Sequence, residues 1–266
     1  MLYSVGKDSS VMLHLARKAF RPGPVPFPLL HVDTGYKFPE MYAFRDEQVR
    51  RLGLRLLVER NEPWIAKACH PLVNGVDRCC SLLKTGALLE ALRRHGFDAA
   101  LGGARREEEK SRAKERVFSV RDVHGQWDPK RQRPELWDLY NGRIDEGESV
   151  RVFPLSNWTE LDVWHYIQQE RIPVVPIYFA MERRVVHRGG ILIPVGDEEV
   201  DGAETVRCRF RSLGCMPCTG AVPSEATTLD GIIAELAAAR RSERENRVID
   251  LTGEASMEEK KKEGYF

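Results

Sequence analysis

The sequence lacks the features that would attach a chain to a membrane or, by charge alone, to nucleic acid. No stretch approaches the ~20 consecutive apolar residues that span a bilayer. Lys and Arg together number 41 and Asp and Glu number 40, which leaves a formal net charge of +1. A chain without an excess of one sign has no long-range attraction to polyanions. Any anion site must therefore be a local cluster, and we expect neither a nucleic-acid nor a membrane partner.

Two other absences concern the compartment and metals. The first residues, "MLYSV", show no charged segment or cleavage site of a secretory leader. Six cysteines without such a leader are typical of a reducing compartment rather than of a disulfide scaffold. We therefore expect a cytoplasmic protein. The seven histidines are scattered without metal-ligand spacing and predict no metal site.

Short apolar runs alternate with helical periodicity along the first hundred of the 266 residues. Runs at 29–32, 54–58 and 98–103 predict strands, and 9–20, 39–52 and 81–96 predict helices. This alternation indicates βαβ units and a parallel sheet, so we predict the α/β class. The strand before Ser4 has only about three residues, fewer than the usual ~5. We therefore expect that an N-terminal segment is missing.

The stretch "YSVGKDSS", residues 3–10, lies between this strand and the first helix. Such a unit points backbone N–H groups and the positive end of the helix dipole at a ligand, which suits phosphate. Gly6 permits close approach of the backbone, and Lys7 adds a cation. The loop matches neither the Walker A motif nor G-x-G-x-x-G. By itself it is equally compatible with an ordinary turn and helix cap.

Two further strand ends are predicted at the same edge of the sheet. Asp33 follows the second strand in "HVDTG", where an acidic group often reaches a ribose hydroxyl. Gly102 and Gly103 end a later strand, immediately before "ARREEEKSRAKER". Open α/β sheets bind ligands outside the carboxyl ends of their strands. An anion cradle, a carboxylate and an arginine cluster are therefore expected to converge.

The arginine cluster predicts an oxyanion site if its segment is helical. A helix would place Arg105, Arg112 and Arg116 on one face. Guanidinium groups bind tetrahedral oxyanions through paired hydrogen bonds. The alternative is a solvated helix held by Glu–Lys and Glu–Arg pairs.

These motifs resemble those of a known superfamily. S-x-G-K-D-S at residues 4–9 is similar to the PP-loop of the N-type ATP pyrophosphatases, and "GARREEEKSRA" to the G-x-R-R motif of their sulfonucleotide branch. Val5 stands where the wider superfamily often has Gly. "WDPKRQRPELW", "NGRIDEGESVRVFPLSNWTELDVWHYI" and "KKKEGYF" extend the resemblance over residues 2–266. Over that length the chain resembles the family of small catalytic subunits of bacterial heterodimeric ATP sulfurylases.

The resemblance implies a fold and a reaction. Residues 1–180 would form a doubly wound, mostly parallel sheet with helices on both faces, of the adenine nucleotide alpha hydrolase-like type. Residues 181–266 would be a C-terminal α+β extension packed on it. The implied reaction converts ATP, bound with Mg²⁺, and sulfate to adenosine 5′-phosphosulfate and pyrophosphate. A separate GTPase large subunit would drive it.

The resemblance also implies residue roles. ATP would be bound by Ser4, Val5, Gly6, Lys7, Asp8, Ser9, Asp33 and Gly103. The catalytic residues would be Lys7, Arg105, Arg106 and Arg112, and sulfate would be bound by Arg105, Lys110, Arg112 and Arg116. No residue is assigned to a metal ion.

Four cysteines form a CC…CxxC set: Cys79, Cys80, Cys215 and Cys218. Four thiolates can hold a [4Fe–4S] cluster, and the set is similar to the cluster signature of assimilatory adenylylsulfate reductases. Buried apolar thiols are an alternative, and so is zinc, although adjacent cysteines are poor zinc ligands.

Other functions stay open at this point. A thiol-dependent adenylylsulfate or phosphoadenylylsulfate reductase needs a nucleophilic cysteine in its C-terminal tail, and no Cys follows Cys218. An ATP pyrophosphatase that adenylates tRNA or another acceptor is disfavoured by the balanced charge and the lack of an RNA-binding module. An ATP-binding regulatory subunit without catalysis would be distinguished by a pyrophosphate-exchange assay.

Overall fold

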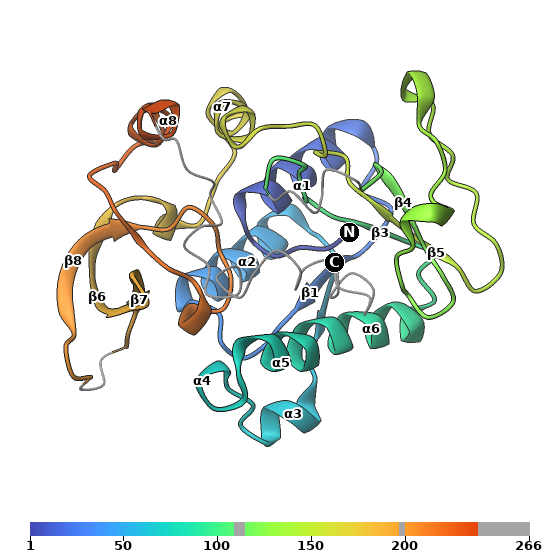
Figure 1. Ribbon diagram of the computed structural model, residues 1–266. Coiled ribbons are helices and arrows are strands. Elements are labelled where there is room, and N and C mark those ends of the chain that lie inside the picture. Colours follow the sequence, from blue (N-terminus) through green and yellow to red (C-terminus); the bar gives the residue numbers. More distant parts are fainter. Residues whose placement is uncertain (109–114, 197–199, 239–266) are drawn as a thin grey trace.

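The computed structural model of the protein describes residues 1–108, 115–196 and 200–238 (Figure 1). At its centre, β1 pairs in parallel with β2, β3 pairs in parallel with β5, and β4 runs antiparallel to β5. These strands are β1 (Leu29–Val32), β2 (Leu56–Glu59), β3 (Ala99–Leu101), β4 (Phe118–Arg121) and β5 (Ser149–Val152).

Residues 1–3 join these strands into one sheet. The backbone N–H of Leu2 donates to the oxygen of Leu101 at 2.8 Å, and the N–H of Leu30 donates to the oxygen of Met1 at 2.8 Å. The resulting order is β2–β1–(1–3)–β3–β5–β4. The short first strand predicted from the sequence is a single parallel bridge, Leu2 to Leu30.

Helices cover both faces of this sheet, as predicted (Figure 1). Leu30 and Ala100 of the strands pack against Leu88 and Leu92 of α6 on one face. Leu29 packs in the main core with α1 and α2 on the other face. The helices are α1 (Lys7–Ala19), α2 (Pro39–Leu52) and α6 (Ala87–His95), the last preceded by a π-helical stretch, η1 (Ser81–Gly86).

The connection between β2 and η1 contains short helices that the sequence pattern did not indicate: α3 (Glu62–Ala66), α4 (Pro71–Asn74) and α5 (Val76–Cys80). Residues 122–148 form a long loop with single 3-10 turns at Pro129–Arg131 and Leu136–Asp138. Strand β5 then leads to α7 (Glu160–Glu170). A capping box between Thr159 and Asp162 begins α7.

The C-terminal part is an antiparallel sheet followed by a helix that contacts α7. The strand order is β7–β6–β8–β9. Val5, Trp164, Tyr178, Phe210 and Ile232 belong to one core cluster, so the two parts are packed together. A division at residue 180 stays a prediction. The elements are β6 (Met181–Arg188), β7 (Ile191–Pro194), β8 (Glu204–Arg209), β9 (Val222–Pro223) and α8 (Leu229–Ala238).

In the part of the chain that the structure describes, no helix combines the length and apolar character needed to cross a bilayer.

Candidate functional site

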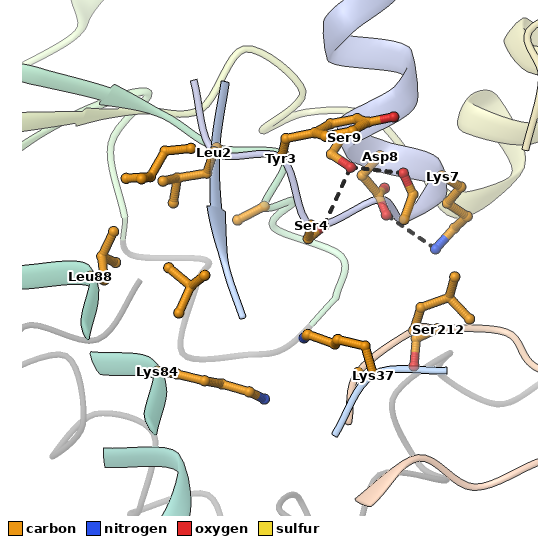
Figure 2. A pocket seen from close by; sticks show the side chains of 18 of the residues that line it. Leu2, Tyr3, Ser4, Lys7, Asp8, Ser9, Lys37, Lys84, Leu88 and Ser212 are labelled. Carbon is orange, nitrogen blue, oxygen red and sulfur yellow. Dashed lines mark hydrogen bonds and ion pairs between the residues drawn. The ribbon is translucent and has the colours of Figure 1, made fainter. Parts of the chain in front are cut away.

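A cavity of about 240 Å³ lies at the carboxyl ends of residues 1–3, β1 and β3, beside the loop that begins α1 (Figure 2). One part of its lining is apolar, contributed by Leu2, Leu30, Val32 and Leu88. The other part is polar, contributed by loop residues Ser4, Gly6, Lys7, Asp8 and Ser9 and by Lys37, Lys84, Thr85, Glu108 and Ser212. An apolar cleft with convergent polar groups is the usual form of a nucleotide site.

The loop of residues 4–9 is held in an unusual conformation. Val5 has φ of +70° and is fully buried, although a β-branched residue rarely adopts positive φ. The N–H of Lys7 donates to the hydroxyl of Tyr178 at 2.8 Å, and the hydroxyl of Ser9 donates to the oxygen of Gly6 at 2.9 Å. Strained backbone of this kind persists where surrounding contacts enforce it and is typical of ligand-binding loops.

Asp8 forms ion pairs with two cations of the predicted site, Lys7 and Arg105. Its Oδ2 is 3.2 Å from Lys7 Nζ, and its Oδ1 is 2.7 Å from Arg105 Nε. Arg105 also pairs with Glu107 at 3.1 Å, and its side chain is fully buried. Lys7 Nζ reaches the backbone oxygen of Arg211 at 3.4 Å. Arg105 thus supports the loop through Asp8, and it lies outside the set of described residues that line the cavity.

Gly103 is required by the close approach of the chain after β3 to the start of α1. A Cβ atom at this position would lie 2.9 Å from Cβ of Asp8 and 3.2 Å from its backbone carbonyl carbon. Any side chain here would displace the helix. Gly103 also lines the cavity, as its predicted role in ATP binding requires.

Asp33 organises the turn after β1. Its Oδ1 accepts hydrogen bonds from the N–H of Gly35 at 2.8 Å and the hydroxyl of Tyr42 at 2.6 Å, and Arg60 lies 3.4 Å from Oδ2. Burial raises the pKa of Asp33, but these hydrogen bonds and the charge of Arg60 outweigh it, and the pKa falls below 3.8. Asp33 is therefore a carboxylate at neutral pH, beside the cavity rather than among its described lining residues.

Two of the remaining cations of the predicted oxyanion site, Arg106 and Arg116, belong to the described residues. Residues 106–108 form a turn, so these residues do not meet the condition of a helical segment under which Arg105, Arg112 and Arg116 would share one face. Arg106 donates to Asn157 and to the backbone oxygen of Glu115. Arg116 is exposed to solvent. Lys110 and Arg112 lie outside the described residues.

The sequence analysis missed Lys37 and Lys84, which line the wall opposite the loop (Figure 2). Lys37 lies four residues after Asp33, between β1 and α2, and this position at the strand edge could have indicated it. Lys84 lies in η1, and nothing in the apolar periodicity distinguishes this π-helical stretch from the following helix.

The four predicted cysteines do lie together. Cys79, Cys80, Cys215 and Cys218 line a second cavity of about 10 Å³, called here the cysteine cavity, which Lys84 also lines. Burial, and then the neighbouring Cys215 and Cys80, raise the pKa of Cys218 to about 12. Burial and the neighbouring Cys69 and Cys80 raise the pKa of Cys79 well above 9.0. Among the described residues, no three His, Cys, Asp or Glu side chains are placed to bind a single metal ion.

Comparison with known proteins identifies the family. The model of the phosphoadenosine phosphosulfate reductase domain matches residues 1–221. A protein of Myxococcus xanthus named "Sulfate adenylyltransferase subunit 2" is 64% identical over 271 residues, which cover 100% of this chain and 89% of that protein. The chain belongs to the sulfate adenylyltransferase subunit 2 family.

A second member of the sulfate adenylyltransferase subunit 2 family, from Azospirillum brasilense, is 62% identical and covers 100% of this chain and 90% of that protein. Among solved structures, the chain is similar to the phosphoadenylyl-sulfate (PAPS) reductase from Candida auris in its phosphate complex. That similarity has a TM-score of 0.46 and 19% identity, covering 66% of this chain and 74% of the other. The family resemblance expected from the sequence is confirmed.

Proposed function

We propose that this chain is the catalytic subunit of a sulfate adenylyltransferase and converts ATP and sulfate to adenosine 5′-phosphosulfate and pyrophosphate. The observation that carries the proposal is a loop with backbone N–H groups and Lys7 lining a cavity with an apolar wall, in a chain 64% identical over its full length to a protein of that name. This reaction is the first step of sulfate assimilation, and we propose that it takes place in the cytoplasm.

In the proposed step, a sulfate oxygen attacks the α-phosphorus of ATP. The bond from the α-phosphorus to the bridging oxygen of the β-phosphate breaks, and pyrophosphate leaves with that electron pair. Sulfate is fully ionised at neutral pH, so no group must remove a proton. The protein's task is to hold two anions in line and to stabilise charge on the transferring group.

Residues in different parts of the cavity would bind different parts of ATP. The apolar wall of Leu30, Val32 and Leu88 suits the adenine ring, and Asp33, beside the cavity, would lie near the nucleoside. The loop N–H groups and Lys7 would hold the β- and γ-phosphates, which leave as pyrophosphate. Mg²⁺ bound with ATP would neutralise part of their charge. Ser4, Val5, Gly6, Asp8, Ser9 and Gly103 would shape this end of the site.

The arginine segment would supply charge beside the transferring group. Arg105 would act through its 2.7 Å ion pair with Asp8, which places the loop. We further propose that Arg106, Lys110, Arg112 and Arg116 approach the α-phosphate and the sulfate when both substrates are bound.

We propose a GTPase large subunit as the partner. The name "subunit 2" of the relatives implies an assembly with another subunit. The printed sequence has no Walker A motif, so GTP hydrolysis would take place on the partner chain. Such coupling would drive the transfer, because the phosphosulfate product is high in energy.

The test is pyrophosphate release from ATP and sulfate, measured with the partner chain and with and without GTP. The matched pair of variants is Lys7→Ala, in the loop, and Lys18→Ala, an exposed lysine in the last turn of the same helix. Lys7→Ala should lose at least 100-fold in turnover, because a charge-assisted contact to the leaving group disappears, while Lys18→Ala should retain activity. Retained activity in Lys7→Ala would refute the assignment of the loop.

We also propose that Cys79, Cys80, Cys215 and Cys218 bind an iron–sulfur cluster. The donor set fits by number and kind, because four buried thiols line one cavity, and Cys80 and Cys215 help to raise the pKa values of Cys79 and Cys218. The cavity of about 10 Å³ holds no more than a water molecule, so the sulfurs must separate on binding. A cluster would then tie α5 to the segment 215–218 and place a fixed charge near Lys84.

Anaerobic purification, iron and sulfide analysis, and absorbance near 400 nm test this proposal. The proposal predicts about four irons per chain, lost in Cys218→Ser and kept in Cys208→Ser. Cys208 is the matched control, since it is equally buried but lies outside the cysteine cavity. Protein without iron in the wild type would rule the cluster out.

A further inference from the structure

The loop of residues 122–148, called here the β4–β5 loop, carries an exposed apolar surface. Five of the eight large apolar side chains that are exposed among the described residues belong to it: Val123, Leu136, Trp137, Leu139 and Tyr140. Four of these five lie within residues 136–140, called here the apolar tip, and Trp137 is 85% exposed. Each large aromatic side chain can bury ~150–250 Å². The tip therefore presents several hundred Å² of apolar area, which marks an interaction site.

Contacts with β4 hold both ends of the apolar tip. At its start, the carboxylate of Glu135 accepts hydrogen bonds from the backbone N–H groups of Val117 at 3.0 Å and of Phe118 at 2.8 Å. At its end, the ring of Tyr140 stacks on the ring of Phe118, with their centroids 5.5 Å apart. The tip is thus fixed on the edge strand of the central sheet. A partner that binds it loses little affinity to the ordering of a flexible segment.

The turn of the apolar tip holds its largest side chain in an unusual backbone conformation. The N–H of Leu139 donates to the oxygen of Leu136 at 3.1 Å and closes the turn. Inside it, Trp137 has φ of +53°, which a bulky residue rarely adopts. Because most of the indole is exposed, its contacts within the described structure contribute little to offset that strain. Backbone strain of this kind clusters at binding and switch sites.

The surroundings of the apolar tip fit a protein–protein interface. A standard interface buries about 800 Å² on each partner, with an apolar core and a polar rim. The tip supplies the core, and Trp and Tyr are enriched among the residues that dominate binding energy. Exposed charged residues that precede and follow the tip in the same loop supply the rim: Asp128, Lys130, Arg131, Arg143, Asp145 and Glu146.

The position of the apolar tip favours the partner subunit as its occupant. Oε2 of Glu135, which anchors the tip, lies 4.0 Å from Nη2 of Arg106. Arg106 follows by three residues Gly103, which lines the nucleotide cavity. A chain docked on the tip therefore touches the support of the arginine segment. Figure 1 shows the β4–β5 loop extending from the outer edge of the central sheet, where a second chain can reach it.

We infer that the apolar tip is the docking site for the partner subunit and that Trp137 enters an apolar pocket on that subunit. The inference rests on the proposed function, in which the partner is a GTPase large subunit. Docking at the tip also gives that subunit a short route to the nucleotide cavity, through Glu135 and Arg106. The partner can thereby influence the transfer without entering the cavity.

The experiment is calorimetric titration of the purified large subunit into Trp137→Asp, Leu139→Asp and the control Val73→Asp. All three changes place the same charge at an exposed apolar position, since Val73 is 79% exposed in α4. Asp also adopts positive φ more readily than Trp, so the turn is kept. The Kd should rise at least ~30-fold in Trp137→Asp and about 10-fold in Leu139→Asp. Val73→Asp should bind like the wild type, and the ATP affinity of each isolated chain should change less than about twofold.

The outcomes separate the docking site from the proposed function. A wild type that binds the large subunit but releases no pyrophosphate from ATP and sulfate would refute the reaction alone, since the titration measures only binding. A large subunit that does not bind the wild type would refute both the docking site and the partner.

Equal Kd values for Trp137→Asp and Val73→Asp would refute the docking site, whatever the activity of the assembly. If Trp137→Asp then also loses self-association in sedimentation, the tip joins two copies of this chain. If it instead has a lower melting temperature, other residues of the chain itself cover Trp137. Either result overturns the assignment to the partner subunit.

Discussion

Replacement of Gly103 by alanine is expected to push the start of α1 away from β3. The new Cβ atom would lie 2.9 Å from Cβ of Asp8, 3.2 Å from the Asp8 carbonyl carbon and 3.4 Å from Sδ of Met12. The first two contacts cannot be relieved by rotation of a flexible side chain, because they involve the backbone of the helix and the atom attached to it. The helix itself must move by a few tenths of an ångström or more.

The expected cost follows from packing. Forcing an extra methyl group into a close-packed contact costs about 1–3 kcal/mol. In a domain of this size, each kcal/mol lowers the melting temperature by about 2–4 °C, so the melting temperature should fall by roughly 2–12 °C. The same movement displaces Asp8, which holds both Lys7 and Arg105, and with it the N–H groups of the loop. ATP affinity should therefore fall by about 10- to 100-fold.

The assay is thermal unfolding together with equilibrium titration of ATP. Gly196→Ala is the matched control, since a Cβ atom at Gly196 meets no atom of the described residues within 4 Å and the glycine does not have a positive φ. The same chemical change is thus made in open space. If Gly103→Ala melts and binds ATP like Gly196→Ala, the close approach of β3 to α1 does not place the loop.

Three other perturbations follow from the buried charges. Arg105→Met removes the 2.7 Å partner of Asp8, so urea unfolding should show a loss of about 3–5 kcal/mol, and an unchanged free energy of unfolding would contradict that pair. Burial raises and the Tyr42 hydrogen bond lowers the pKa of Asp33, with a net value below 3.8. The resulting stability is present above pH 3.8 and is lost as the pH falls through the folded pKa. Wild type and Tyr42→Phe should therefore differ in urea unfolding at neutral pH and converge as the pH falls through the folded pKa of Asp33, and a constant difference would refute the linkage. Burial lowers the pKa of His31 from 6.5 to about 4, so the unfolded chain takes up this proton first as the pH falls. Stability should decrease by roughly 3 kcal/mol between pH 6.5 and 4, and His31→Asn should flatten that decrease when unfolding is measured across this range; an equally steep decrease in the variant would exclude His31 as its source.

Where local signals are strong, the sequence alone predicts the elements accurately. The helix expected over 39–52 coincides with α2, because Pro39 begins it and Gly53, in the left-handed conformation, ends it. The helix beginning after Thr159 was likewise marked by its capping box. The alternation of these helices with short apolar runs was then enough to predict the layered α/β fold.

Strand β4 was missed because only one of its three buried positions, Val120, is apolar. Ser119 and Arg121 are both buried, and Arg121 is compensated by Glu115 at 2.7 Å. The apolar pattern that marks a strand is therefore missing, and β4 cannot be distinguished within a segment dense in charge.

Contacts between residues that are distant in the sequence also could not be predicted. Arg105 was expected to bind the ligand. Its guanidinium group instead donates a hydrogen bond to Asp8, which lies 97 residues earlier in the sequence. Nothing local to either residue predicts that pair.

The contacts that hold the loop also determine when, during synthesis of the chain, the nucleotide site can form. The strand that precedes the loop bonds to Leu101, the N–H of Lys7 bonds to Tyr178, and the ammonium group of Lys7 reaches the backbone of Arg211. Chains fold largely in the order of synthesis, and contacts between distant residues form late. A nascent chain will therefore contain the loop long before it has a nucleotide site. ATP should stabilise only chains extended past residue 211, which makes nucleotide binding a reporter of completed folding.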